Sequence, residues 1–150
     1  MAEPKSKIAQ EGLKENEKKW GKPLLEAGWS MIPSTIIERQ KALGLEPIDL
    51  NIILHIINHW WKADSKPFPS KKKIADAVGV TSRTVQRRIA AMEKGGLIRR
   101  EERRIPGTGS KTNIYHLDGL IKEATPFAKE TLANRKNDQA KRHNQVNKKG

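Results

Sequence analysis

The segment from residue 71 to residue 98 constrains the fold most, because it predicts two helices joined by a tight turn. The first helix has one apolar face, made by residues at helical spacing: Ile74, Ala75 and Val78. Gly79 follows it, and glycine accepts the left-handed backbone that often ends a helix. Val80 places an apolar side chain within the turn, and Ser70 can cap the first helix.

The second helix is predicted from about Ser82 to Lys94. Thr81 is a suitable N-cap, because its hydroxyl can accept a hydrogen bond from a free amide of the first turn. An apolar stripe follows the helical period along one side, through Val85, Ile89 and Met92. Gly95 and Gly96 then end the helix.

The opposite face of this second helix is polar near its amino end, where it carries Ser82, Arg83, Gln86 and Arg87. The last three side chains project in one direction, because their spacing is i, i+3, i+4. Arg and Gln carry the donors and acceptors that match guanine and adenine edges in the major groove of DNA. We therefore predict that these four residues read bases. The alternative is that they are ordinary solvated side chains on a helix surface.

Two predicted strands follow, at residues 97–104 (LIRREERR) and 112–117 (TNIYHL), and turn-forming residues lie between them at 106–111. Two short helices followed directly by a hairpin resemble the winged helix-turn-helix of DNA-binding proteins. The motif GVTSRTVQRR followed by MEKGGLI carries this resemblance, which covers about residues 48 to 118. It is nearest to the domains of bacterial, phage and plasmid regulators and replication proteins.

The resemblance implies a mainly α fold with a small antiparallel β-hairpin: a three-helix core plus a wing, an N-terminal brace and a C-terminal helix. It also implies sequence-specific binding to double-stranded DNA, with the second helix in the major groove. Contacts to the DNA backbone are then expected from Lys71, Lys72, Lys73, Thr81 and Arg88. The wing is expected to grip a neighbouring phosphate run or minor groove through Arg103, Arg104 and Lys111.

Transcription regulation is the function that the resemblance favours, and initiation of plasmid or phage replication at an origin is the alternative. A protein-interaction module on the same scaffold is a further alternative, because a fold does not fix a function. RNA binding is disfavoured. The expected basic face has a single aromatic residue that could stack on unpaired bases, Tyr115.

Positive charge is concentrated in two parts of this chain of 150 residues, whose formal net charge is +13. Residues 66–118 hold 13 Lys and Arg against 5 Asp and Glu, and residues 127–150 hold 7 against 2. Residues 28–65, by contrast, hold 3 against 4. This distribution indicates a polyanionic partner for the predicted reading unit, because clustered cations gain affinity by releasing the counterions of a polyanion.

Three regions are predicted along the chain. Residues 1–27 are poor in apolar side chains and are expected to be flexible or weakly helical. Residues 28–125 form the winged domain with its brace, which includes a short helix from Ser34 to about Leu43. Residues 126–150 form a basic tail, which is predicted to be disordered from Asn134 onward and to neutralise phosphates of any sequence.

A strongly apolar helix is predicted at residues 50–62, with Asp49 as its cap. Its expected core stripe is Leu50, Ile53, Leu54, Ile57 and Trp61. Because the other faces are also apolar, residues 29–43 or a second copy in a homodimer must cover them. Phe68, in the proline-rich link that follows, is expected to anchor beneath the hairpin.

Several classes of function are disfavoured. The chain has no Cys, so it has no disulfides, thiolate metal sites or cysteine nucleophile. His55 and His59 have a chelating spacing, but Ile56 stands where a metalloprotease helix has Glu. We therefore expect no metal, no cofactor and no enzymatic activity. The longest apolar stretch is too short and polar to span a bilayer, and the first residues lack a signal core. A cytoplasmic, nucleoid-associated protein is expected.

Overall fold

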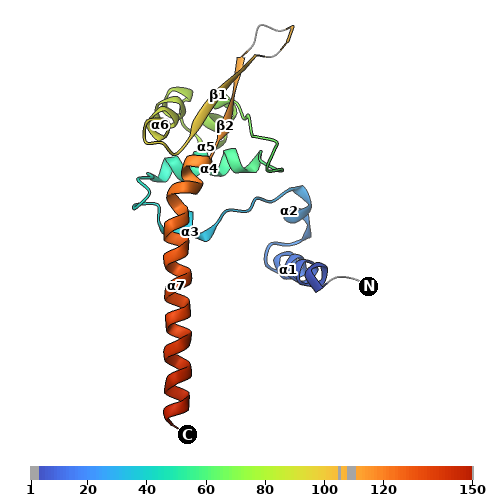
Figure 1. The fold of residues 1–150 in the computed structure, drawn as a ribbon. Coiled ribbons are helices and arrows are strands. Elements are labelled where there is room, and N and C mark those ends of the chain that lie inside the picture. The colour runs from blue at the N-terminus through green and yellow to red at the C-terminus, as the bar shows by residue number, and fades with distance from the viewer. Residues whose placement is uncertain (1–3, 105, 108–110, 150) are drawn as a thin grey trace. The chain divides into compact units, whose positions relative to one another are not determined.

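The computed structural model describes residues 4–104, 106–107 and 111–149, and it divides the chain into two compact units, Met1–Met31 and Ile32–Gly150. The first unit holds α1 (Pro4–Trp20) and α2 (Lys22–Ala27) (Figure 1). The two helices meet at Gly21, whose φ of 84° interrupts the helical path. The first unit is therefore more helical than the sequence predicted.

The second unit is built on three helices: α4 (Pro47–Asn58), α5 (Lys71–Val78) and α6 (Ser82–Lys94). The short helix α3 (Ser34–Glu38) precedes them, and a two-stranded antiparallel sheet and a long helix follow, as β1 (Arg99–Arg104), β2 (Lys111–His116) and α7 (Asp118–Lys148) (Figure 1). This mainly helical architecture with one small hairpin confirms the predicted winged helix-turn-helix fold.

The turn between α5 and α6 has the predicted caps. The Ser70 hydroxyl accepts a hydrogen bond from the Lys73 amide at 3.1 Å and caps α5. Gly79 ends α5 in the left-handed region with a φ of 82°. The Thr81 hydroxyl accepts from the Thr84 amide at 3.1 Å and caps α6. Both helices have the predicted bounds because these signals lie within a few residues of each helix end.

The hairpin is tied at its base to the loop that precedes α5. β1 and β2 pair antiparallel over their whole length, from the pair Arg99–His116 to the pair Arg104–Lys111. The Tyr115 amide donates a hydrogen bond to the Pro67 carbonyl at 2.9 Å, and both residues are buried. Residues 108–110 of the predicted turn at 106–111 lie outside the described residues. The strand pairing and the bond from Tyr115 to Pro67 together hold the base of the wing against the core.

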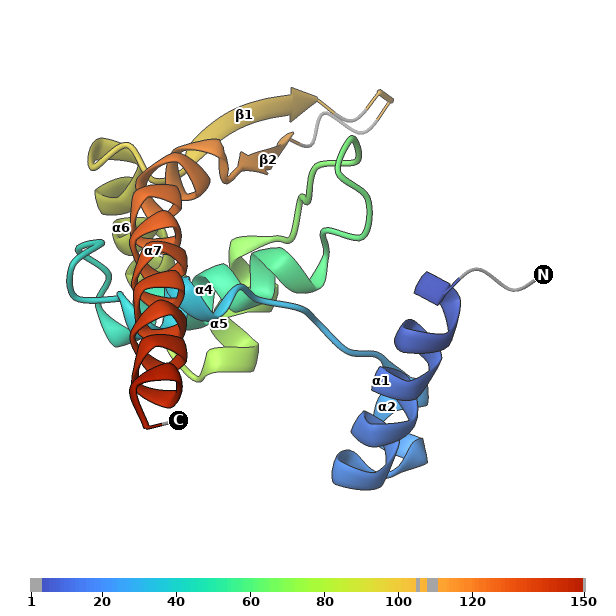
Figure 2. The same ribbon diagram turned by 60° about the horizontal axis from the view of Figure 1, so that its bottom comes forward.

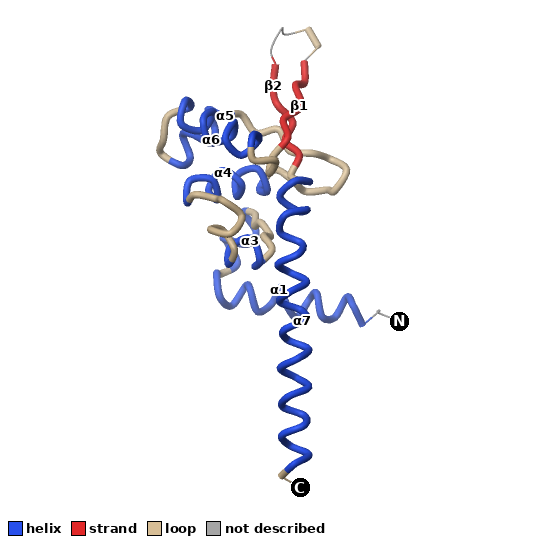
Figure 3. The backbone as a smooth tube through the Cα atoms, turned by 60° about the vertical axis from the view of Figure 1, so that its left-hand side comes forward, coloured by secondary structure: helices blue, strands red, loops and turns tan. Residues whose placement is uncertain are grey.

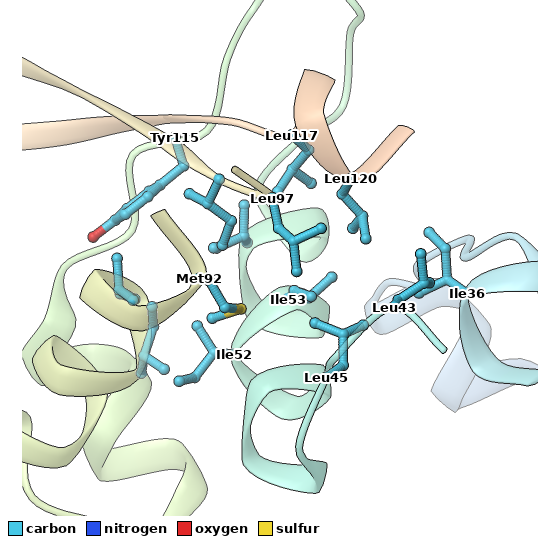
Figure 4. Packing of buried hydrophobic residues seen from close by; sticks show 14 of the residues in the cluster. Ile36, Leu43, Leu45, Ile52, Ile53, Met92, Leu97, Tyr115, Leu117 and Leu120 are labelled. Carbon is cyan, nitrogen blue, oxygen red and sulfur yellow. The ribbon is translucent and has the colours of Figure 1, made fainter. Parts of the chain in front are cut away.

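The core lies where α4, α5 and α6 meet the base of the hairpin (Figure 4). Each of these elements contributes buried side chains, including Ile52, Ile53, Ile56, Ile74, Ala75, Val85, Ile89, Met92, Leu97 and Tyr115. Three residues extend the core toward α3: Ile36, Leu43 and Leu45. The predicted stripe of α6 is confirmed, because Val85 and Ile89 have no exposed surface and Met92 is 3% exposed.

The buried face of α4 differs from the predicted one. Ile53 is buried as expected, but Leu54 is 36% exposed, and Trp61 lies beyond the end of the helix and is 74% exposed. The buried residues of α4 are instead Asp49, Ile52, Ile53 and Ile56. Asp49 is also not the cap. It is the third residue of a helix capped by Glu46, whose amide donates to an Asp49 carboxylate oxygen at 2.8 Å.

The C-terminal region is a single helix in the structure, so the predicted disorder from Asn134 onward is wrong. The first part of α7 packs on the domain through Leu120 and Ala124, which are buried. From residue 132 to residue 149 every side chain is exposed. Figures 1 and 3 show this second part continuing past α3, and Figure 2 views the same helix more nearly along its axis. A helix that is polar on all sides gives no apolar period, which is why the sequence pattern did not reveal it.

Over the ranges that the structure describes, no helix combines the length and the apolar character needed to cross a membrane.

Candidate nucleic-acid interface

The face of α6 that points away from the core carries the four predicted base-reading residues. Ser82, Arg83, Gln86 and Arg87 are all exposed, whereas Val85, Ile89 and Met92 on the opposite side are buried. The core therefore fixes the rotation of α6 about its axis. These four exposed side chains form one polar surface at the amino end of α6. The three-helix core holds this helix in place.

The amino end of α5 presents cations next to this helix. Lys72 and Lys73 are exposed, but Lys71 is partly buried. Burial lowers the pKa of the Lys71 ammonium, and the positive charge of Arg100 lowers it further, while Glu93 acts in the opposite direction. Of the three lysines predicted to contact phosphates, Lys72 and Lys73 therefore have the more open side chains.

Arg88 has an internal partner that the sequence did not indicate. Its guanidinium donates two hydrogen bonds to the Asp49 carboxylate, at 2.8 and 2.7 Å, and it lies 3.5 Å from a Glu46 carboxylate oxygen. The hydrogen bonds to Asp49 raise the pKa of Arg88 above its ordinary value. The Arg88 side chain is only 19% exposed, and Asp49 is fully buried. Arg88 therefore joins α6 to α4, and its guanidinium is already occupied by carboxylates of α4 and its cap.

A second ion pair joins the end of α6 to the start of the wing. The Glu93 carboxylate accepts hydrogen bonds from the Arg100 amide at 3.0 Å and from two guanidinium nitrogens of Arg100 at 2.9 and 3.1 Å. These bonds lower the pKa of Glu93 and raise that of Arg100. Since Glu93 lies in the last turn of α6, the pair fixes β1 relative to the helix with the polar face.

The wing presents exposed cations on β1. Arg103 and Arg104 are exposed, as the prediction requires. The Arg103 guanidinium carbon lies 5.1 Å from the centre of the Phe68 ring, within the range of a cation–π contact. Lys111 begins β2, but its side chain lies outside the described residues. Phe68 is 52% exposed, so it does not anchor beneath the hairpin, and the buried residue of that link is Pro67.

The exposed aromatic residues of the second unit lie where the sequence did not place them. Tyr115, the predicted candidate for stacking, is 1% exposed, and burial raises the pKa of its hydroxyl. Trp61 and Phe68 are exposed instead. The sequence pattern predicts both residues in the core, because apolar side chains usually lie there. The sequence does contain a sign that Trp61 is exposed, since this residue lies at the end of the apolar run, next to Lys62.

The two histidines with chelating spacing do not gather other ligands. His55 is partly buried and His59 is exposed. Among the residues that the structure describes, no group of three or more His, Cys, Asp or Glu side chains could hold a metal ion.

A match to one known family supports the helix-turn-helix fold. Residues 43–98 match a family described as "Helix-turn-helix domain", and this range contains α4, α5 and α6. One similar solved structure is described as a possible transcriptional regulator from Methanosarcina mazei Go1. It is 19% identical, with 68% of this chain and 82% of that chain covered, and the TM-score is 0.44. No curated protein sequence matches this chain.

Proposed function

We propose that this protein binds double-stranded DNA in a sequence-specific manner and regulates transcription without enzymatic activity. The observation that carries the proposal is the exposed polar face of α6, in a segment that matches a helix-turn-helix family. Arg83, Gln86 and Arg87 project from this face, and their groups can form paired hydrogen bonds to guanine and adenine in the major groove. Ser82 lies at the start of the same face and can contact either type of base.

The remaining proposed contacts are to the DNA backbone and would set the register of α6 on the duplex. Lys71, Lys72 and Lys73 form the first turn of α5, and Thr81 caps the amino end of α6. Lysines in this position neutralise phosphates without reading sequence. The Thr81 hydroxyl already caps α6, so its DNA contact would be shared with that role. On β1, Arg103 and Arg104 would bind phosphates or the minor groove, together with Lys111 at the start of β2.

Binding to a defined site is sufficient for regulation, because an occupied site excludes other proteins from the same DNA. The cytoplasm, at the nucleoid, is the proposed place of action. Binding to a replication origin would use the same contacts, and it would differ from transcription regulation only in where the target site lies. Docking of another protein on this face is the remaining alternative, and it predicts no preference among DNA sequences.

The proposal is tested by selecting bound duplexes from a random pool with the full chain, followed by gel shifts at two salt concentrations. We expect one enriched sequence motif. We also expect affinity for that motif to fall with salt, with a slope of about 0.9 for each phosphate contact. A pool that shows no enrichment after repeated rounds would contradict sequence-specific binding.

A further inference from the structure

A hollow in the second unit lies between the loop after α4 and the amino end of α5. Its volume is about 410 Å³, and its walls include Trp61, Phe68, Pro69 and Lys73, with His59 at the end of α4. Sites for small organic groups usually have volumes of roughly 300–1,000 Å³ and combine apolar walls with a few polar groups. The hollow therefore has the size and the mixed lining of a binding site for an aromatic, charged group.

Two aromatic rings in this lining are left open to solvent. Trp61 is 74% exposed and Phe68 is 52% exposed. The loop that carries them is held by backbone hydrogen bonds, from the Ser65 amide to the Lys62 carbonyl at 3.1 Å and from Tyr115 to Pro67 at 2.9 Å. The rings are thus presented by an ordered loop. Large apolar side chains that stay exposed in this way often mark a binding surface.

Two cations lie at this hollow, and a third lies on the loop beside it. Lys73 lines the hollow, and the Arg103 guanidinium carbon lies 5.1 Å from the centre of the Phe68 ring. Lys66 belongs to the same loop, and its ammonium lies 4.8 Å from the centre of the Trp60 ring. Proteins that hold unpaired nucleotides combine these two features: cations for the phosphates and aromatic rings on which bases stack.

We propose that this hollow binds an unpaired nucleotide of single-stranded DNA. The base stacks on Trp61 or Phe68, and its phosphate lies at Lys73. The cations favour this ligand over an apolar segment of a partner protein, which would gain nothing from them. Arg103 belongs both to the wing and to the contact with Phe68, so the hollow adjoins the surface proposed for duplex DNA. The choice of DNA over RNA rests on that proposed function, but the stacking site does not.

The first test measures binding of the full chain to a labelled oligothymidylate of about 12 nucleotides by fluorescence anisotropy. Replacement of a stacking aromatic by alanine costs ~1–3 kcal/mol per base, so at least one of Trp61→Ala and Phe68→Ala should bind roughly 5- to 150-fold more weakly, and that loss identifies the stacking ring. Trp61→Phe should retain most of the affinity, because a ring remains. Trp29→Ala is the matched control, since Trp29 is 50% exposed and lies in the first unit. Unchanged affinity in both alanine variants would overturn the proposal.

Three further measurements separate stacking from charge and from the proposed duplex contacts, and DNA from RNA. An oligomer of the same length without bases should bind weakly and equally to the wild type and to the alanine variant that weakens oligothymidylate binding. If the variant loses the same factor on both oligomers, the rings do not stack on bases and the proposal fails. The triple variant Arg83→Ala, Gln86→Ala, Arg87→Ala should keep its oligothymidylate affinity even if duplex recognition fails. Tighter binding to oligouridylate than to oligothymidylate would overturn the choice of DNA.

Discussion

Asp49 and Arg88 form the contact that most changes how the residues of this chain are interpreted. Their side chains make two hydrogen bonds between positions 39 residues apart in the sequence. The buried carboxylate loses its hydration, and the guanidinium compensates for this loss only while the pair is intact. A charged residue that looked available for DNA is therefore needed to hold α6 against α4.

Replacement of Arg88 by Met should destabilise the protein by about 3–5 kcal/mol, because it leaves the Asp49 charge buried without its partner. Chemical denaturation measures this loss. The double variant Arg88→Met, Asp49→Asn should recover part of it, since no uncompensated charge then remains. Folded Arg88→Met should keep the salt dependence of DNA binding. A shallower slope with unchanged stability would mean instead that Arg88 contacts phosphate.

At the scale of elements, the junction between α6 and α7 depends on a close backbone approach. The Leu120 amide donates to the Leu97 carbonyl at 2.9 Å, which draws the start of α7 against the turn after α6. A Cβ atom added at Gly119 would lie 1.8 Å from the Gly96 carbonyl oxygen. This oxygen belongs to the backbone, so it cannot move aside as a flexible side chain would.

Gly119→Ala should therefore lower the free energy of unfolding by roughly 1–3 kcal/mol, the usual cost of overpacking. Gly95→Ala is the matched control, because a Cβ there meets its nearest atom at an ordinary 3.5 Å, and Gly95 has a helical φ of −76°. That control should be neutral or slightly stabilising. Equal melting temperatures for the two variants would show that α7 does not approach the turn this closely.

Local signals explain which elements could be predicted from the sequence. The bounds of α5 and α6 follow from Ser70, Gly79 and Thr81, each of which acts within a few residues. The buried face of α4 could not be predicted, since Asp49 is buried only because of a distant partner. The polar face of α6 was predicted as a unit, but the exposure of Trp61 depends on how the following loop packs. Propensity and pattern do not encode that packing.

For the whole second unit, the position of the basic residues on α7 decides whether they can act with α6. A helix rises 1.5 Å per residue, so the end of α7 lies about 25 Å beyond Thr131, the last partly buried residue before its exposed part. Screening in physiological salt reduces interactions between exposed charges beyond about 8 Å. We therefore expect an ordered α7 to hold its terminal cations away from a duplex bound at the polar face.

Deletion of residues 134–150 should consequently leave the preferred sequence of duplex binding unchanged. The slope of log affinity against log salt should change by less than about 0.9, which corresponds to one phosphate contact. Gel shifts on matched and scrambled duplexes at several salt concentrations measure both quantities. A flexible tail that wraps the duplex would give the opposite result, a clearly shallower slope on both duplexes.

The central claim is that the exposed face of α6 reads DNA sequence, and the most direct measurement compares two charge-matched variants on the selected duplex and on a scrambled one. One double variant replaces Arg83 and Arg87 of α6 by alanine, and the other replaces Arg135 and Arg142 of α7 by alanine. Each variant therefore removes two exposed arginines. The α6 variant should lose ~1–3 kcal/mol per residue on the selected duplex and little on the scrambled one. The α7 variant should keep its preference between the duplexes. Equal losses on both duplexes for both variants would show that the arginines of α6 supply charge alone and would contradict the claim.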